Sequence, residues 1–157
     1  MEDLEFFLKS RPWLVPVVAC LKSEELRARD IALELGTSAR VVKRALLALA
    51  RLGLVERIGE GKYRLAEGAR ERVERALAEL NTIRQGRLFV VDLGAEYAVL
   101  KPRRRYVRTR RIGKEVVEIV SRAREDLPPC QLAAELGVGA REVALARRVA
   151  RLLGGRR

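Results

Sequence analysis

One pattern of residues recurs in this sequence 101 residues further along the chain. When residues 30–53 are aligned with residues 131–154, ten pairs are identical. These pairs are Ala32/Ala133, Glu34/Glu135, Leu35/Leu136, Gly36/Gly137, Ala39/Ala140, Arg40/Arg141, Val42/Val143, Ala45/Ala146, Leu52/Leu153 and Gly53/Gly154. Apolar positions three and four residues apart predict helices in both copies, and a glycine separates the two helices of each copy. We therefore expect the same pair of helices, joined by a tight turn, at two places in the fold.

The residues around the first copy extend this pair of helices. Apolar residues over 13–21 predict a buried helix before it, and Ser38 can cap its second helix. The buried side of that second helix is predicted to be Val42, Ala45, Leu46, Leu49 and Leu52. Residues 54–58 and 62–65 alternate apolar and polar side chains on either side of Gly59–Gly61, which indicates a β-hairpin.

Three helices followed by a hairpin, over residues 13–65, resemble the winged helix-turn-helix domain of prokaryotic and archaeal transcription regulators. The resemblance rests on the small Ala32 at the helix crossing, on Gly36 where the turn needs a positive φ, on the apolar frame of Ile31, Leu35, Val42 and Ala45, and on the segment "LxRLGLVER…GEGKYRLA" over residues 49–66. It implies that the second helix of the pair reads the major groove and that the hairpin is the wing. The second copy implies a further helix-turn-helix without a wing.

The remaining residues predict one more helix, a small sheet and the approach to the second copy. A helix of about five turns is predicted from the spacing of Ala69, Val73, Ala76, Leu77, Leu80 and Ile83. Strands of an antiparallel meander are predicted over residues 88–93, 96–101 and 104–109, separated by Gly94 and Pro102. Helices are predicted over 112–125 and 140–153, with a turn at Pro128–Pro129.

These patterns together predict a mainly α fold with a small β component, in three parts. Residues 1–65 form the winged helix-turn-helix domain, and residues 66–85 form an amphipathic linker helix. Residues 86–157 form a short, basic antiparallel β meander followed by a helical, helix-turn-helix-like domain.

Positive charge is concentrated in the second half of the chain. Lys plus Arg number 33 against 21 Asp plus Glu, for a net charge of +12 and a pI near 10.7. Residues 1–85 carry +3 of this and residues 86–157 carry +9, and residues 101–111 hold seven cations and no acid. The excess of positive charge predicts an anionic partner: nucleic acid, an anionic membrane surface or an acidic protein. Because folded surfaces normally mix both signs, the run at 101–111 is expected either to have an electrostatic role or to be disordered.

Nucleic-acid contacts are expected from four groups of residues. On the second helix of the first copy, Arg40, Arg44, Leu47 and Arg51 form an outward stripe, and residues at its N-terminus approach base edges. A plain solvated face is the alternative. The expected contacts are Thr37, Ser38, Arg40, Lys43, Arg44 and Arg51; Arg57, Lys62 and Arg64 on the wing; Lys101, Arg103, Arg104, Arg105, Arg108, Arg110 and Arg111 in the basic run; and Arg141, Arg147 and Arg148 in the second copy. Tyr106 can stack on an unpaired base or pack internally.

Composition excludes several classes of chemistry. The chain has no histidine, which excludes imidazole catalysis, Ser-His-Asp and Cys-His arrangements and His-ligated metals. No catalytic, metal or cofactor motif remains, because Gly59–Lys62 lacks the spacing and the Ser/Thr of a phosphate loop, and we expect no enzyme and no cofactor. Cys20 and Cys130 are expected to be small buried residues.

The same composition bears on location and source. The longest apolar run is too short to span a membrane, and the N-terminus is acidic where a signal peptide is basic, so a cytoplasmic, nucleoid-associated protein with no membrane partner is expected. Of the 33 basic residues, 27 are Arg, and Asn, Gln and Met are scarce, which fits a thermophilic prokaryote or a GC-rich genome.

We expect a homodimeric sequence-specific or chromatin-type DNA-binding protein, a transcriptional regulator whose partner is double-stranded DNA. The alternatives are an RNA-binding or ribosome-associated winged-helix protein and a protein-interaction module of the transcription or replication machinery. Regulators of the resembled type commonly pair through a helix after the wing, so Val73, Leu77 and Leu80 are the expected dimerisation residues. In the alternative, this helix lies back on its own domain.

Overall fold

The structure is a computed structural model that describes residues 3–22, 24–123 and 126–154. In these ranges the α-helices are α1 (Leu4–Ser10), α2 (Val15–Cys20), α3 (Ala28–Leu35), α4 (Ala39–Arg51), α5 (Ala69–Glu79), α6 (Lys114–Arg122), α7 (Pro129–Leu136) and α8 (Ala140–Gly154). Two short 3-10 helices are η1 (Pro12–Leu14) and η2 (Gly59–Gly61). The described residues therefore form a mixed fold that is mainly α, with two antiparallel sheets.

The two sheets differ in size and connection. The smaller sheet has the order β1-β3-β2, from β1 (Leu26–Arg27), β2 (Val55–Arg57) and β3 (Lys62–Leu65). The larger has the order β4-β5-β6-β7, from β4 (Ile83–Gln85), β5 (Leu88–Asp92), β6 (Glu96–Pro102) and β7 (Val107–Gly113). Each neighbouring pair in the larger sheet is a hairpin, so its two outer turns lie at one end and its middle turn at the other.

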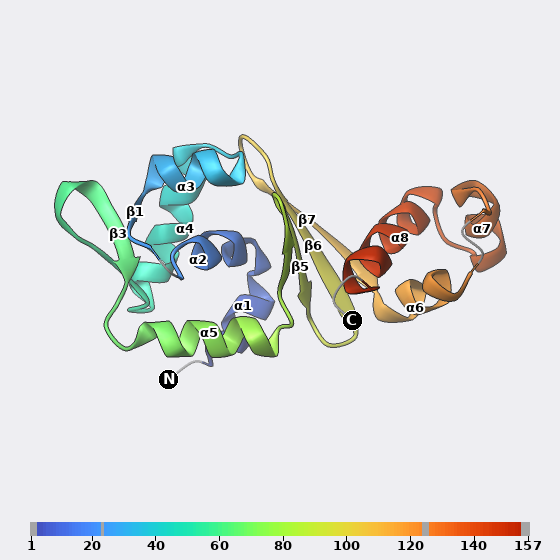
Figure 1. The fold of residues 1–157 in the computed structure, drawn as a ribbon, viewed down its shortest axis with the longest axis horizontal. Coiled ribbons are helices and arrows are strands. Elements are labelled where there is room, and N and C mark those ends of the chain that lie inside the picture. Colours follow the sequence, from blue (N-terminus) through green and yellow to red (C-terminus); the bar gives the residue numbers. More distant parts are fainter. Residues whose placement is uncertain (1–2, 23, 124–125, 155–157) are drawn as a thin grey trace.

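The larger sheet separates two hydrophobic cores (Figure 1). On β5, Phe89 and Val91 belong to the core formed with α1–α5, whereas Val90 belongs to the core formed with α6–α8. On β6, Leu100 faces the first core and Val99 the second. Successive side chains of a strand point to opposite faces, so each of these strands lines both cores. We call α1–α5 with the smaller sheet the N-terminal unit, and α6–α8 the C-terminal unit.

The repeated stretch of sequence forms the same local structure twice. α7 begins and ends 101 residues after α3, and α8 begins 101 residues after α4. Both turns contain a glycine in the left-handed region, Gly36 at φ 74° and Gly137 at φ 70°. The next N–H in each turn donates to the carbonyl five residues back, from Thr37 to Ala32 at 3.0 Å and from Val138 to Ala133 at 3.1 Å. We call α3–α4 the first helix pair and α7–α8 the second.

α5 is shorter than the sequence predicts. The predicted five-turn helix ends at Glu79, and Ile83 lies instead in β4, where it pairs with Val90. Asn81 takes a positive φ of 46°, which ends the helix, and pairing with β5 then satisfies the backbone groups of residues 83–85. The third predicted part begins at residue 86, but β4 lies before this residue and belongs to the same sheet as the strands after it. The predicted boundary therefore divides one sheet.

The predicted meander is present, with β4 added and its last strand displaced. Residues 104–109 were expected to form that strand, but β7 begins at Val107 and continues to Gly113. Residues 103–106 form a tight turn in which the Arg103 N–H donates to the Tyr106 carbonyl at 2.7 Å. A turn spreads consecutive arginines into water, whereas a strand would place their charges beside those of its neighbour. We call β6, this turn and β7 together the arginine hairpin.

Polar contacts fasten both ends of the larger sheet. At the end with the middle turn, Asp92 accepts from Lys114 Nζ at 2.7 Å and from the Gly94 N–H at 2.8 Å. Partial burial raises the pKa of Asp92, but these hydrogen bonds outweigh it and hold the pKa below its ordinary value. At the other end, Arg84 pairs with Glu34 of α3 at 3.2 Å, and Arg87 Nη2 donates to the Leu33 carbonyl at 3.2 Å.

Candidate nucleic-acid interface

α4 presents a face rich in cations to solvent. Its buried side consists of Val41, Val42, Ala45, Leu46 and Leu49, close to the predicted set. The side chains on its exposed side are Arg40, Lys43, Arg44, Leu47 and Arg51. Within the described residues none of these cations has an ion-pair partner, and α4 itself contains no acid. The predicted stripe therefore lies in solvent, with the exposed Leu47 between Arg44 and Arg51.

Two residues expected at the base-contacting end of α4 are used in other ways. Ser38 caps the helix, with its hydroxyl accepting from the Val41 N–H at 3.4 Å. The Thr37 hydroxyl oxygen is enclosed and has no hydrogen-bond partner in the described structure. The enclosed Thr37 hydroxyl is corrected as a base contact. The cap uses Ser38 only as an acceptor and leaves its O–H able to donate, so the Ser38 contact stays a prediction. Of the three expected at this end, Arg40 is the residue whose side chain is exposed.

The β2–β3 hairpin has its positive charge compensated by acids. Arg64 donates from Nε to Glu56 at 2.7 Å and lies 3.9 Å from Glu25. At the hairpin turn, the Glu60 side chain is 74% exposed, and Arg27 reaches it at 3.9 Å. Arg57 and Lys62 carry no ion pair among the described residues, yet they share this small surface with the acids. This hairpin is therefore a weak site for phosphate.

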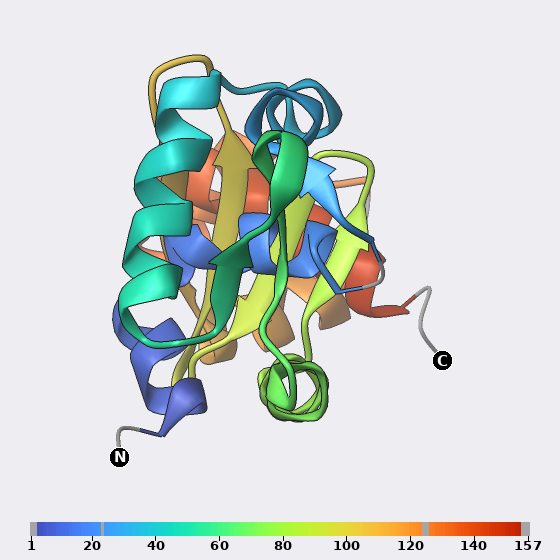
Figure 2. The ribbon, with the colours of Figure 1, turned by 90° about the vertical axis from the view of Figure 1, so that its left-hand side faces the viewer.

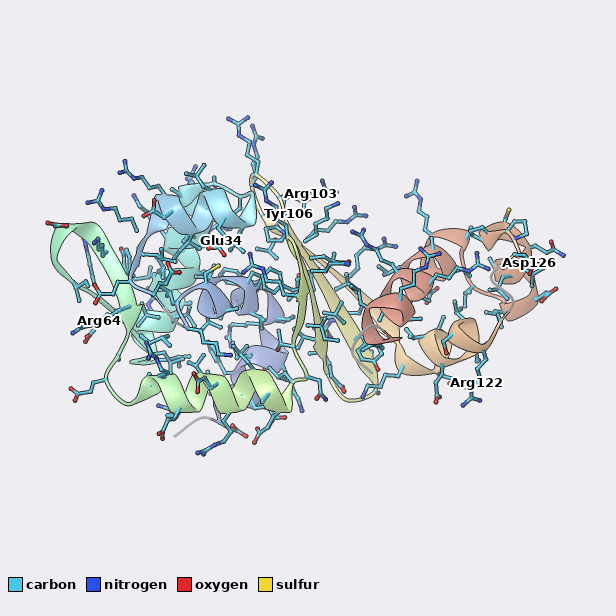
Figure 3. All side chains as sticks on the ribbon, in the orientation of Figure 1. Glu34, Arg64, Arg103, Tyr106, Arg122 and Asp126 are labelled. Carbon is cyan, nitrogen blue, oxygen red and sulfur yellow. The ribbon has the colours of Figure 1, made fainter. Side chains whose placement is uncertain are left out.

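The arginine hairpin is the opposite case. Of the seven cations over residues 101–111, Arg111 pairs with Glu96 at 3.1 Å, and the other six have no ion pair within the part of the chain that the structure describes. Lys101 and Arg108 lie directly opposite each other on β6 and β7, an arrangement of like charges that destabilises a sheet. The positive charges of the hairpin therefore repel one another, and a bound anion would reduce this repulsion. Tyr106, 56% exposed, lies at its tip (Figure 3).

The tip of the arginine hairpin and the N-terminal end of α4 lie side by side at the upper edge of the molecule in both views (Figures 1 and 2). Their relative position is set by the shared N-terminal core, to which Leu100 of β6 contributes. It is also set by the contacts of Arg84 with Glu34 and of Arg87 with the Leu33 carbonyl, which join the sheet to α3. The tip of the hairpin, residues 103–106, and α4 therefore form one composite face. Lys101, Arg108 and Arg110 are outside it, because the pairing of β6 with β7 places them on the sheet face of Val99, which lines the C-terminal core.

The second helix pair repeats the backbone of the first but not its surface. At the positions of Arg44 and Arg51 of α4, α8 carries Leu145 and Leu152. Leu145 is buried in the C-terminal core. Part of the side of α8 that corresponds to the exposed side of α4 therefore packs within the C-terminal unit. Arg141 and Arg148 are exposed, whereas Arg147 is half-buried and donates to the Leu127 carbonyl at 2.6 Å. The structure therefore does not gather these three arginines into a stripe like that of α4.

The residues expected to form a dimer contact are buried in their own chain. Val73 and Leu80 have no exposed surface and Leu77 is 7% exposed, and all three belong to the N-terminal core. α5 packs on α1 and α2, which is the alternative stated for this helix. The dimerisation role of these three residues is corrected accordingly: they stabilise their own unit. Whether the chain forms a dimer stays a prediction.

The described residues contain no group of three or more His, Cys, Asp or Glu that could hold a metal ion. Burial raises the pKa of the Cys20 thiol to about 12, which makes this thiol unreactive. Cys130 was expected to be buried, but it is exposed on α7.

A groove of about 920 Å³ lies between α6 and α8, but Lys114 and Arg122 on its walls are already paired with Asp92 and Glu118. Over the described residues no helix is long and apolar enough to cross a membrane.

The chain matches no protein-family model, no curated protein and no solved structure. Any functional conclusion therefore depends on the chain's own residues. Sequence reasoning missed the contacts of Arg84 and Arg87 with α3, although Gly86 between two short strand-like runs is a hairpin signal. That glycine was interpreted as the start of a new part of the chain instead.

Proposed function

We propose that this protein binds double-stranded DNA through the composite face of α4 and the tip of the arginine hairpin. The observation that carries the proposal is the group of seven cations on α4 and the hairpin tip that have no ion-pair partner among the described residues: Arg40, Lys43, Arg44, Arg51, Arg103, Arg104 and Arg105. An exposed cationic helix fits the major groove, and phosphate contacts release counterions.

The sequence resemblance supports the same proposal. The first helix pair followed by the β2–β3 hairpin corresponds to the winged helix-turn-helix interpretation, with α4 as the recognition helix. The role in transcription regulation or chromatin is part of this proposal. The second helix pair is proposed as a helix-turn-helix-like structural unit without a reading face, because Leu145 and Leu152 replace arginines.

The repeat supplies a matched control for the experiment. We compare Arg40→Ala/Arg44→Ala on α4 with Arg141→Ala/Arg148→Ala on α8, because both variants lose two exposed arginines and the same net charge. Binding to a labelled duplex is measured by fluorescence anisotropy at two salt concentrations. We expect the α4 variant to bind at least about tenfold more weakly and to lose about two units of the salt slope, while the α8 variant changes less than about threefold.

Equal weakening in both variants would contradict the proposal, because it would mean that only total charge matters. Single-stranded DNA and structured RNA are titrated in parallel. Tighter binding of RNA than of duplex DNA at both salt concentrations would overturn the choice of partner and favour the RNA-binding alternative. Loss of preference among duplexes of different sequence in the α4 variant would identify α4 as the reading element.

A further inference from the structure

The tip of the arginine hairpin concentrates guanidinium groups in very little chain. Three of its four residues are Arg103, Arg104 and Arg105, and one backbone hydrogen bond from Arg103 to Tyr106 closes the turn. None of the three arginines has an ion-pair partner among the described residues. The acid of this hairpin, Glu96, lies at the far end of β6 and is paired with Arg111. The tip therefore projects positive charge with no nearby acid on the same ribbon.

The hairpin that would ordinarily be assigned a groove-contacting role is unsuited to it here. The β2–β3 turn carries the exposed Glu60, and its Arg64 is bonded to Glu56. A carboxylate at the leading point of a hairpin repels phosphate and the electronegative floor of a groove. Figure 3 shows Arg64 on β3 and Arg103 on the arginine hairpin, on separate sides of the N-terminal helices. The two hairpins therefore do not share one surface.

We propose that the tip of the arginine hairpin inserts into the minor groove beside the major groove occupied by α4, and that it favours A·T base pairs there. The minor groove, about 6 Å wide, admits side chains but not a helix, and it narrows and becomes more negative over A·T tracts, where arginine is attracted. The contacts of Arg84 and Arg87 with α3 join the sheet that carries the hairpin to the helix before α4, so the tip and α4 can reach adjacent grooves. This inference rests on the proposed binding of duplex DNA.

The test uses three duplexes that separate the two grooves. An alternating A·T duplex, an alternating G·C duplex and an alternating inosine·C duplex are titrated with the full chain. Inosine keeps the major-groove edge of guanine but lacks the amino group that guanine places in the minor groove. We expect the A·T and inosine·C duplexes to bind about tenfold more tightly than the G·C duplex, because the minor groove is what the tip reads.

Two variants assign this preference to the tip. Changing Arg103, Arg104 and Arg105 together to Lys keeps the charge, and we expect it to keep binding of the G·C duplex within about threefold while the preference for A·T and inosine·C falls below about twofold. Arg57→Ala/Lys62→Ala on the β2–β3 hairpin is the comparison variant and should keep the preference. Circular dichroism of each variant checks that it folds.

The outcomes separate this inference from the proposed function. If inosine·C binds like G·C, or if the Lys variant keeps the full preference, the minor-groove inference is wrong. If the Arg57→Ala/Lys62→Ala variant loses the preference instead, the β2–β3 hairpin has the role and the inference is also wrong. The proposed function fails separately, when Arg40→Ala/Arg44→Ala binds every duplex as the unchanged protein does.

Discussion

Gly36 combines two constraints, one on the backbone and one on the space beside it. Its φ of 74° is costly for any residue with a Cβ, and a Cβ built there would lie 2.7 Å from Arg87 Nη1. Gly137, at the matching position of the second helix pair, has almost the same φ of 70° but no atom within 4 Å of that point. A comparison of Gly36 with Gly137 therefore separates the effect of crowding from the effect of backbone strain.

We predict that Gly36→Ala lowers the free energy of unfolding by about 2 kcal/mol and Gly137→Ala by about 1 kcal/mol, because only the former displaces Arg87 from the Leu33 carbonyl. Urea unfolding of both variants measures the difference. In an Arg87→Ala background the excess cost of Gly36→Ala should vanish, as a double-mutant cycle would detect. An undiminished excess would mean that Arg87 is not the residue that crowds this turn.

Single residues also mark where sequence reasoning succeeds and fails. The exposure of Arg40, Arg44 and Arg51 follows from helical period, since the buried positions of α4 are apolar and regularly spaced. The enclosure of the Thr37 hydroxyl does not follow from any period, because it depends on how the turn packs in three dimensions. The Ser38 cap does follow from the sequence, because a serine directly before a run of apolar helical spacing is a typical N-cap.

Among the elements, α5 shows that an amphipathic pattern identifies a buried face without identifying what buries it. The spacing correctly predicts that Val73, Leu77 and Leu80 lie on one buried side. That side packs against α1 and α2 of the same chain. The length of α5 was overestimated because Ile83 continues the same spacing into β4. Similarly, β7 was displaced in the prediction because a turn without glycine or proline at its centre leaves no local signal.

We predict that Leu77→Asp unfolds the protein or lowers its free energy of unfolding by more than about 3 kcal/mol, because a carboxylate would be buried without a partner. Ala78→Asp, which adds the same charge at the next, exposed position of α5, should cost about 0.5 kcal/mol. Thermal unfolding followed by circular dichroism compares them, with light scattering for molecular mass. A folded Leu77→Asp protein of half the original mass would instead restore α5 as a dimer contact.

At the scale of the whole molecule, two hydrophobic cores share one sheet, and no local sequence pattern predicts this arrangement. The sequence did predict strands over residues 88–93 and 96–101 from their apolar and β-branched residues. It did not predict that β5 and β6 are covered on both faces, since burial on two sides depends on helices distant in the chain. The resulting molecule has a helical unit on either face of a central sheet (Figure 1).

We predict that the two units open separately. Val143→Ala in the C-terminal core should lower the opening free energy of amides in α6–α8 by about 2 kcal/mol and leave α3 and α4 little changed. Val42→Ala, at the matching position 101 residues earlier and equally without exposure, should do the reverse. Native-state hydrogen exchange measures both. An equal loss of protection throughout the chain, in both variants, would mean that the shared sheet couples the two cores into one cooperative unit.

The double coverage of β5 has a consequence for how related sequences should be aligned with this one. Residues 88–91 are apolar on both faces, so a shift of one residue would still place an apolar side chain against each core. Hydrophobicity alone therefore does not define the pairing of β5. The pairing is instead marked by the polar contacts at its two ends, Asp92 with Lys114 and Arg87 with the Leu33 carbonyl. A distant relative is better recognised by these end residues than by its apolar run.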